Sequence, residues 1–517
     1  MAAKRLVLTT LPARAPRSRQ RGRTLGSRGV RVVALSAEEE DLGPSAVSCS
    51  FRLGDSTVSL ETGRIGRQAN AAVLAREGDT SLYTTVCSER QAAADASFLP
   101  LTVVYQERFS AAGRTSSGFV KRDGRQRDSD TLVSRLVDRP LRPLFADGFY
   151  NETQVLQLVL SWGGERSADA LAITAAGAAA LISDLPFVKP VVGVRVGWLR
   201  GAPSPVVNPT VAQMEGSRLD LVVAGTRDAV LMIEGFADFI SDDDMLTAVE
   251  AATAAMGPAC DAIAEWAAKV GKHKDASLVS RSHAGIDAAL DAAVGAQLTA
   301  AMLVGRKQER ALACLACDVS AVAQLAPTFG AAAVSTALKA AHSRAVRGLL
   351  RSEGLRADGR GPSDVRPISS SAGDLPVVHG CALFTRGETQ ALAVVTLGGE
   401  ADSQRSETLG EADARARFTL QYFFPPSSVG ETGRVGAPSR RELGHGCLAE
   451  RALVPCLPSS DDFPYAMRLE STITESNGSS SMATVCAGWL ALRDAGVPLL
   501  RPVAVRPTTT NFVPSVY

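Results

Sequence analysis

The stretch "RLVDRPLRPLF" at residues 135–145 recurs in altered form as "CLAERALVPCL" at 447–457, 312 positions further along the chain. Four more residue pairs keep this displacement: Ser167 with Ser479, Ala175 with Ala487, Pro186 with Pro498, and Pro190 with Pro502. Matches at one constant displacement over so long a segment indicate an internal repeat. The sequence therefore predicts two copies of one structural unit, near residues 46–245 and 362–517.

Each predicted copy begins with short stretches of alternating polar and apolar residues and continues into helical runs. "SLYTTVCSE" (81–89) is typical of a half-buried strand, and "ALAITAAGAAALISD" (170–184) is typical of a buried helix. Between the copies, residues 246–350 are rich in alanine and follow a helical period, with breaks at Gly and Pro. We expect a mixed α/β (α+β) fold with an all-helical domain joining the two copies.

The two copies differ in length after their last shared proline. Copy one continues beyond Pro190 with a predicted strand pair, "LDLVVAGTRDAVLMIEG" (219–235). After Pro502 only 15 residues remain, and Pro and Thr occupy positions where the repeat predicts strands. The second copy is therefore expected to be incomplete.

Composition limits the class of protein. The chain has 517 residues, of which 45% are apolar and 21% charged, typical of a globular protein of two to four domains. No continuous apolar run is long enough to predict a membrane span. The nine cysteines are scattered, which fits a reducing compartment. A single C-x-x-C (Cys314, Cys317) without a second pair argues against a metal or redox site.

The first 37 residues differ from the rest of the chain. They contain nine Lys or Arg and no acidic residue, which is typical of an organelle transit peptide. A basic nucleic-acid-binding arm is the alternative. Without this segment, 46 basic residues (55 − 9) face 54 acidic ones, so anion binding must depend on local patches. "VRVVALSA" (30–37) loosely resembles a plastid cleavage region, which favours the chloroplast over the mitochondrion.

The segment "TESNGSSSMATV" (474–485) predicts a helix that begins at a serine cluster in copy two. Free backbone N–H groups, the positive end of the helix dipole and the hydroxyls of Ser479, Ser480 and Ser481 would together suit phosphate. An ordinary capped helix is the alternative. Copy one has Ala168 and Asp169 at two of these positions, and a carboxylate there would repel phosphate.

The segment "APSRRELGHG" (437–446) adds further polar groups to copy two. Adjacent Arg440 and Arg441 offer bidentate donors suited to phosphate, and His445 could donate to an oxyanion or a leaving oxygen. The alternative is that the arginines form surface ion pairs with neighbours such as Glu442.

Copy one concentrates positive charge in residues 108–142, which hold nine Lys or Arg and four Asp. Within a Gly-rich loop there, one aromatic ring lies beside three cations; the residues are Phe119, Lys121, Arg122 and Arg125. Base stacking on the ring and cations for the backbone would hold single-stranded RNA without sequence preference. A solvated basic loop is the alternative.

Several longer motifs resemble the polynucleotide phosphorylase family from about residue 50 to about residue 503. They are "FLPLTVVYQER", "AAGR", "RLVDRPLRPLF", "FTRGETQALAVVTLG", "FPPSSVGETGRVGAPSRRELGHG" and "TESNGSSSMA". The resemblance implies two ribonuclease PH-like cores (ribosomal protein S5 domain 2-like) joined by an all-helical domain. It also implies a homotrimer that threads RNA, removes 3′ nucleotides with inorganic phosphate as nucleoside diphosphates, runs reversibly, and uses Mg²⁺.

By position, the resemblance makes Ser479, Ser480 and Ser481 the phosphate cradle, with Arg440, Arg441 and His445 as neighbouring active-site groups. The loop around Phe119 resembles the RNA-gripping channel loop of the family. The family commonly has two aromatics and two arginines there, whereas this chain has Val120 and Lys121 at the second aromatic and the first arginine. A weaker grip on RNA is expected.

The carboxylates that hold the metal in the family are expected beyond the point where this chain departs from the pattern, so no metal ligand is assigned. The C-terminal KH and S1 modules of the family are likewise expected to be absent. The first interpretation is a C-terminally truncated phosphorolytic exoribonuclease acting in organellar RNA turnover. The alternative is a catalytically inactive RNA-binding or assembly subunit. A hydrolytic nuclease is disfavoured because no acidic cluster is visible.

Overall fold

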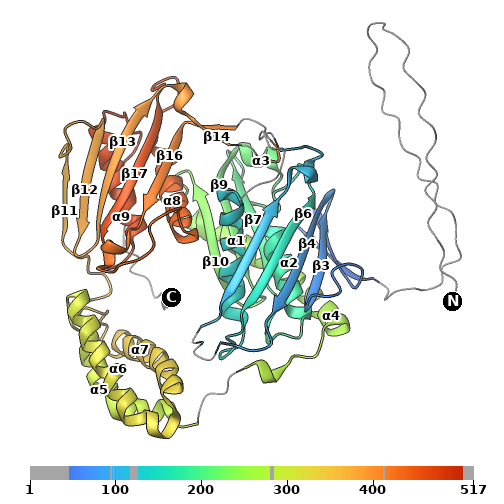
Figure 1. The fold of residues 1–517 in the computed structure, drawn as a ribbon. Coiled ribbons are helices and arrows are strands. Elements are labelled where there is room, and N and C mark those ends of the chain that lie inside the picture. The colour runs from blue at the N-terminus through green and yellow to red at the C-terminus, as the bar shows by residue number, and fades with distance from the viewer. Residues whose placement is uncertain are drawn as a thin grey trace, which may run out of the picture. The chain divides into compact units, whose positions relative to one another are not determined.

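The computed structural model describes residues 46–93, 96, 98–116, 126–279, 284–406, 408–410 and 414–504. The predicted transit peptide (1–37), the loop with Phe119, Lys121, Arg122 and Arg125, and residues 505–517 lie outside the described residues. Figure 1 shows two β-sheet units and a group of helices between them in the sequence.

The first half is built on a six-stranded sheet in the order β1-β2-β3-β4-β6-β5. Its strands are β1 (Val47–Leu53), β2 (Ser56–Thr62), β3 (Ala71–Glu77), β4 (Thr80–Ser88), β5 (Leu101–Glu107) and β6 (Thr153–Ser161). Neighbouring strands are antiparallel except β5 and β6, which are parallel. Strand β4 buries every second side chain, including Leu82 and Val86, as its alternating sequence predicts.

The second half repeats this arrangement with a five-stranded sheet in the order β11-β12-β13-β17-β16. Its strands are β11 (Ile368–Ala372), β12 (Gly380–Arg386), β13 (Gln390–Gly398), β16 (Phe418–Phe423) and β17 (Ala466–Glu475). The one parallel pair is again the last, β16 with β17. Helix α8 (Arg440–Leu453) packs on β16, and α9 (Ser480–Asp494) covers β12 and β13. The duplication read from the sequence is therefore present in the fold.

The first half also contains a second sheet, in the order β10-β9-β7-β8. Its elements are β7 (Val192–Leu199), β8 (Val206–Val207), α3 (Val211–Glu215), β9 (Ser217–Gly225) and β10 (Val230–Ala237). Helix α2 (Asp169–Ile182) contacts strands of both sheets, and nearly every residue in it is buried. Its alanine-rich sequence supplies the small side chains that such close packing needs. Within the described part of the second half, no equivalent of this second sheet is found.

Helix α4 (Asp242–Val270) belongs to the core of the first half. The sequence expectation placed residues 246–350 in one helical domain, but α4 packs against β1 and β7 through Ala248, Ala252, Met256 and Ile263. A separate apolar cluster is formed only by α5 (Ile286–Met302), α6 (Lys307–Phe329) and α7 (Ala331–Ser352). Periodicity indicates that a helix has an apolar face but does not say which surface will cover it.

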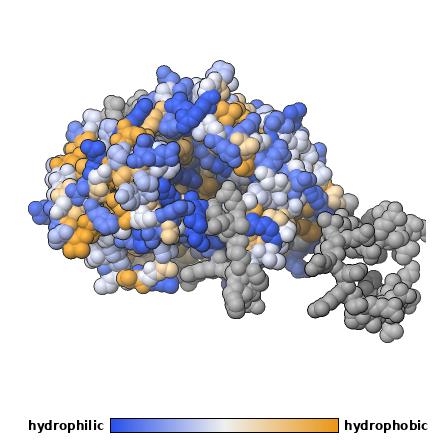
Figure 2. All heavy atoms as spheres, turned by 90° about the horizontal axis from the view of Figure 1, so that it is seen from above, coloured by the Kyte–Doolittle hydropathy of each residue, from blue (hydrophilic) through white to orange (hydrophobic). Residues whose placement is uncertain are grey.

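The remaining elements include α1, which packs on β5 and α2 in the core of the first half, and shorter segments. They are η1 (Phe109–Ala112), α1 (Asp128–Leu141), η2 (Arg142–Leu144), η3 (Ala276–Leu278), η4 (Glu400–Asp402), β14 (Gln404–Ser406), β15 (Ala414–Ala416), η5 (Pro426–Val429) and η6 (Val454–Cys456). Helix α6 is, among the described residues, the one helix long and apolar enough to cross a membrane, and one such helix is weak evidence for a span. On the face seen in Figure 2, polar residues surround separate apolar patches.

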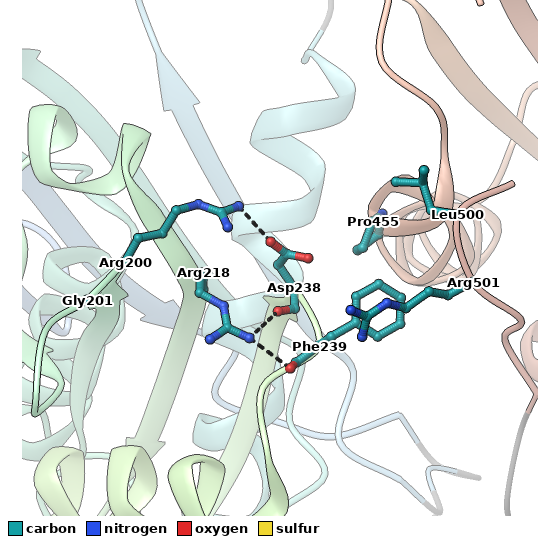
Figure 3. Close-up of a pocket in the computed structure, with 8 residues that line it drawn as sticks. All are labelled: Arg200, Gly201, Arg218, Asp238, Phe239, Pro455, Leu500 and Arg501. Atoms are coloured by element: carbon teal, nitrogen blue, oxygen red, sulfur yellow. Dashed lines mark hydrogen bonds and ion pairs between the residues drawn. The ribbon is translucent and has the colours of Figure 1, made fainter. Parts of the chain in front are cut away.

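The two halves contact each other where α1 packs on α8. A pocket of about 460 Å³, shown in Figure 3, is lined by residues of both halves. In this pocket the guanidinium of Arg501 stacks on the ring of Phe239, with 4.6 Å from its carbon to the ring centroid. Arg218 donates to the carbonyl oxygens of Asp238 and Phe239, and Arg200 pairs with the Asp238 carboxylate at 2.6 Å. These bonds hold Phe239 in a left-handed backbone conformation, φ 49°, which is uncommon for a residue with a side chain.

Candidate active site

The serine cluster of the second half lies where β17 passes into α9. Helix α9 begins at Ser480, as the sequence pattern predicted, and Ser479 is its N-cap residue. Ser480 and Ser481 are buried, whereas Ser479 is exposed. Within the described part of the chain, the Ser479 side chain makes no capping hydrogen bond, and its Oγ lies 3.4 Å from Ser481 Oγ. The first-turn N–H groups therefore have no side-chain cap there and can bind an external acceptor.

Side chains from three segments hold the backbone loop that leads into the serine cluster. Arg386 donates to the carbonyl oxygen of Ser479 at 2.8 Å, and Arg366 donates to that of Asn477 at 2.6 Å. Lys307, at the start of α6, donates to the carbonyl oxygen of Ser476 at 2.7 Å. In a trans peptide the C=O and the following N–H point in opposite directions. The Arg386 contact therefore directs the N–H of Ser480 away from Arg386.

The start of α8 presents a second group of polar residues. Ser439 and Glu442 form a capping box: Glu442 N donates to Ser439 Oγ at 3.2 Å, and Ser439 N donates to Glu442 Oε2 at 2.8 Å. The same carboxylate accepts from Phe424 N at 2.9 Å. Glu442 therefore accepts hydrogen bonds from the backbone. Among the ion pairs of the described residues, none joins it to Arg440 or Arg441, the alternative considered from the sequence.

Arg440 and Arg441 have different surroundings although they are adjacent. Arg440 donates through one terminal nitrogen to the carbonyl oxygen of Val103, in β5 of the first half, at 2.8 Å. Arg441 lies over the ring of Phe424, with 5.2 Å between its guanidinium carbon and the ring centroid. Arg440 therefore ties the two halves together, whereas Arg441 remains on the side of α8 near β16.

Tyr422, which the sequence analysis did not single out, connects the two helix starts. Its hydroxyl lies 2.6 Å from Ser480 Oγ, and its ring stacks on His445 with centroids 5.4 Å apart. The ring of Phe424 stacks on Tyr422 in turn, with centroids 6.5 Å apart. The structure thus brings together the serine cluster, Arg441 and His445. Tyr422 lies in β16 and Phe424 directly after it, two positions apart, which is the spacing that puts side chains on one face of a strand. Nothing in the sequence distinguishes these rings from core aromatics.

His445 is neutral at physiological pH. Burial, together with the positive charges of Arg441 and Arg135, lowers the pKa of His445 to about 4. Its Nδ1 is buried and has no hydrogen-bond partner among the described residues. A neutral imidazole has one N–H donor and one acceptor nitrogen, so His445 can offer a hydrogen bond without adding charge.

Arg135, from α1 of the first half, is another residue that sequence reasoning missed as a site group. A Cβ added at Gly444 would lie 2.4 Å from Arg135 Nε, so this arginine crosses α8 directly beside the site. Burial lowers the pKa of Arg135, and Arg139 and Arg441 also contribute. Arg135 belongs to the repeated stretch, and copy two has Cys447 at the same place. The sequence therefore showed a difference between the copies there, but not that Arg135 contacts α8.

The equivalent helix start in the first half already carries its own anion. Asp169 begins α2, and its carboxylate accepts from Ala170 N at 2.7 Å and from Arg195 at 3.1 Å. Arg195 also pairs with Asp220 at 2.6 Å. A carboxylate at an N-terminus compensates the helix dipole internally. Of the two repeated helix starts, only that of α9 has serines in place of this carboxylate.

The pKa of His445 predicts how stability changes with pH. The unfolded chain binds a proton at this histidine below about pH 6.5, but the folded chain binds it only below about pH 4. Between these values the unfolded state holds more protons, so the free energy of unfolding decreases as the pH falls. The melting temperature should drop from pH 6.5 to pH 4, and His445→Gln should reduce this drop. His273→Gln, at an exposed position, is the control, and an equal drop in His445→Gln would contradict the expectation.

The described residues do not fit a magnesium site. No group of three or more His, Cys, Asp or Glu side chains that could hold a metal ion is found among them. Glu442, the carboxylate at the start of α8, is already taken by backbone N–H groups. We therefore derive no chemical step through a metal ion.

Comparisons with known proteins agree with this architecture. A family model described as "3′ exoribonuclease family, domain 1" matches residues 56–186 and again 364–498, and "domain 2" of the same family matches residues 189–255. The two matches to domain 1 fall on the two repeated units, and domain 2 falls on the second sheet of the first half and the start of α4.

Curated relatives share much of this sequence. A polyribonucleotide nucleotidyltransferase of Protochlamydia amoebophila is 47% identical over 88% of this chain and 66% of its own length. A probable chloroplastic polyribonucleotide nucleotidyltransferase of Oryza sativa subsp. japonica is 44% identical over 89% of this chain and 57% of its own. The corresponding protein of Magnetococcus marinus is 47% identical over 88% and 65%. The chain spans two thirds or less of these relatives, and with both repeated units matched it belongs to the 3′ exoribonuclease family.

Proposed function

We propose that this protein is a polyribonucleotide nucleotidyltransferase that shortens RNA from the 3′ end with inorganic phosphate and releases nucleoside diphosphates, reversibly. The observation that carries the proposal is the convergence of the α9 serine cluster with Arg441 and His445 around Tyr422. The names of the curated relatives support the reaction class.

In this reaction an oxygen of inorganic phosphate attacks the terminal phosphodiester phosphorus, and the bond to the 3′ oxygen of the shortened RNA breaks. The first-turn N–H groups of α9 and the hydroxyls of Ser479 and Ser481 would hold the attacking phosphate. Arg441 would offset the repulsion between the two anions, and neutral His445 would donate a hydrogen bond to a phosphate oxygen or to the leaving 3′ oxygen. Arg440 would keep this constellation fixed against the first half.

The reaction is tested by incubating the purified chain with 3′-labelled RNA. Nucleoside diphosphate should appear only when phosphate is present, and an excess of nucleoside diphosphate should lengthen the RNA. Omitting and restoring Mg²⁺ tests the metal requirement that the resemblance implies. Release of nucleoside monophosphate without phosphate would indicate hydrolysis and refute the proposal. RNA binding without any release would identify an inactive RNA-binding or assembly subunit.

The loop with Phe119, Lys121, Arg122 and Arg125 is proposed to grip single-stranded RNA. Phe119→Ala should weaken binding of an oligonucleotide by roughly tenfold, because one base–aromatic stack contributes about 1–3 kcal/mol. Replacing the three cations by Gln should also reduce the salt dependence of binding. Fluorescence anisotropy at two salt concentrations measures both effects. Lys269→Gln, an exposed lysine in α4, is the control, and equal affinities for all variants would contradict this role.

Assembly and location are proposed from the resemblance and from the chloroplastic name of the rice relative. We propose a homotrimer that acts in organellar RNA turnover, in the chloroplast, with residues 1–37 as the targeting segment. Light scattering of the purified chain measures its molar mass, which should be that of a trimer. The location of a fluorescent fusion with and without residues 1–37 tests whether these residues direct the protein to the chloroplast. A monomer, or a plastid signal independent of these residues, would contradict the respective proposal.

A further inference from the structure

Asn477 precedes the serine cluster by two residues, and its side chain is held as firmly as its backbone. The amide nitrogen Nδ2 donates to Glu388 Oε2 at 2.7 Å, and the backbone N–H donates to Thr389 Oγ1 at 3.0 Å. The carbonyl oxygen of Asn477 accepts from Arg366 at 2.6 Å. If the amide were turned over, its oxygen would face the Glu388 carboxylate, and two acceptors cannot form a hydrogen bond. Asn477 is therefore fixed in both position and orientation.

Glu388 connects this asparagine to the central helices. The same oxygen, Oε2, accepts from the backbone N–H of Lys307, the first residue of α6, at 3.1 Å. A carboxylate is favourable at a helix N-terminus, because the first N–H groups have no partner within the helix and the dipole is positive there. Lys307 Nζ in turn donates to the carbonyl oxygen of Ser476, next to Asn477, at 2.7 Å. The start of α6 and the segment before α9 are therefore joined by one carboxylate and one lysine.

Gly478 lies between Asn477 and the N-cap residue of α9, Ser479. Its φ is 144°, a backbone conformation that favours glycine. Gly478 has no side chain that could hold the chain by itself, so a shift of Asn477 passes to the first-turn N–H groups of α9. These N–H groups hold phosphate in the proposed reaction, and their direction depends on how Asn477 is held.

The first half has two acidic residues at the equivalent positions. The displacements of the repeat put Asp79 at the place of Glu388 and Glu165 at the place of Asn477. Two ionised carboxylates have no hydrogen to share, and within the described part of the chain no hydrogen bond joins Asp79 to Glu165. The carboxylate–amide contact of the second half therefore has no counterpart between these two residues.

The threonine beside each of these acidic residues has the same role in both halves. Thr80 Oγ1 accepts from the backbone N–H of Gly163 at 3.1 Å, as Thr389 accepts from that of Asn477. Threonine therefore supports the loop in each copy, whereas the carboxylate–amide contact accompanies the serine cluster and not the Asp169 helix start. This distribution fits a role in the site better than a role in the fold that both copies share.

We propose that Asn477, held by Glu388, is a positioning residue of the phosphate site, through which the start of α6 sets the direction of the N–H groups that bind phosphate. This role rests on the proposed function, because it acts through the serine cluster. Neither side chain needs to touch phosphate, since the pair fixes the backbone beside it. The central helices thereby support the site, in addition to linking the two repeated units.

Exchanging the two groups tests this role, with the affinity of the full chain for inorganic phosphate measured by titration calorimetry. Asn477→Asp places a second carboxylate against Glu388 and should weaken phosphate binding by about tenfold or more. Glu388→Gln keeps an oxygen that can accept both bonds, so it should change the affinity by less than about threefold. The double variant, Asn477→Asp with Glu388→Gln, restores one donor and one acceptor with their places exchanged and leaves the net charge unchanged. Its affinity should return to within about threefold of the unmodified chain.

Two further measurements separate positioning from a general loss of folding. In phosphorolysis, Asn477→Asp should raise the KM for phosphate and leave the KM for RNA unchanged, which a partly unfolded chain would not do. Glu250→Gln, at an exposed position of α4, is the control and should bind phosphate as the unmodified chain does.

The outcomes distinguish this proposal from the proposed reaction. Equal phosphate affinity in all variants, or a double variant no better than Asn477→Asp, would overturn the positioning role and leave the reaction standing. Absence of phosphate binding in the unmodified chain would instead refute the phosphate site, and the positioning role with it.

Discussion

Ser481→Asp should reduce the phosphate-dependent release of nucleoside diphosphate by at least about 100-fold, the typical effect of losing one oxyanion donor. The substitution installs the residue that the first half carries at this position, Asp169. There Arg195 balances the carboxylate, and the helix start needs no external anion. In the second half an added carboxylate would occupy the positive end of α9 and repel the attacking phosphate.

Two measurements separate this effect from a loss of folding. Ser481→Asn has a similar size but no charge, so it should keep more activity than Ser481→Asp, with a raised KM for phosphate. Ser352→Ala, which changes an exposed serine at the end of α7, should leave the rate unchanged. Melting temperatures of all three variants show whether each is folded, since Ser481 is buried and an aspartate there places a charge in a buried position. Full phosphorolysis by a well-folded Ser481→Asp would refute the phosphate site.

Gly177→Ala should lower the free energy of unfolding by about 1–3 kcal/mol, the usual cost of overpacking a core. Gly177 lies in α2, and a Cβ there would be 2.2 Å from Val191 Cγ1 and 2.8 Å from the Val191 carbonyl oxygen. The second contact is to backbone, so a side-chain rotation cannot relieve it. Helix α2 and the start of β7 would have to separate, which would open the core between the two sheets of the first half.

Gly348→Ala is the matched control, because a Cβ at this helical glycine meets no atom within 4 Å. It should raise stability by about 0.5–1 kcal/mol, since alanine loses less backbone entropy than glycine in a helix. Denaturant unfolding of both variants checks the pair. Equal stability of Gly177→Ala and the unmodified chain would mean that the contact between α2 and β7 is looser than these distances indicate.

The sequence could predict the repeated units because their signals are local and occur twice. Strand alternation in β4 follows from residues close together in the chain. The constant displacement of 312 residues shows that a similar local pattern occurs a second time. The beginning of α9 at Ser480 was predictable for the same reason, since serine and glycine are suited to a helix start. The sequence expectation that α4 belongs to the central helical domain was not met by the structure. An apolar stripe such as Ala248 and Ala252 shows that a helix has a buried face, but not which element packs against that face.

The sequence alone determined the duplication, the α/β character of each unit and the location of the serine cluster at the start of a helix. Tertiary structure alone decided that Tyr422 would bond Ser480 and stack on His445, that Arg440 would reach Val103, and that Glu388 would join Asn477 to the start of α6. Local propensity acts over a few residues and can be read along the chain. Contacts between distant segments depend on sheet order and helix packing, which set the distances between side chains only once the whole fold has formed.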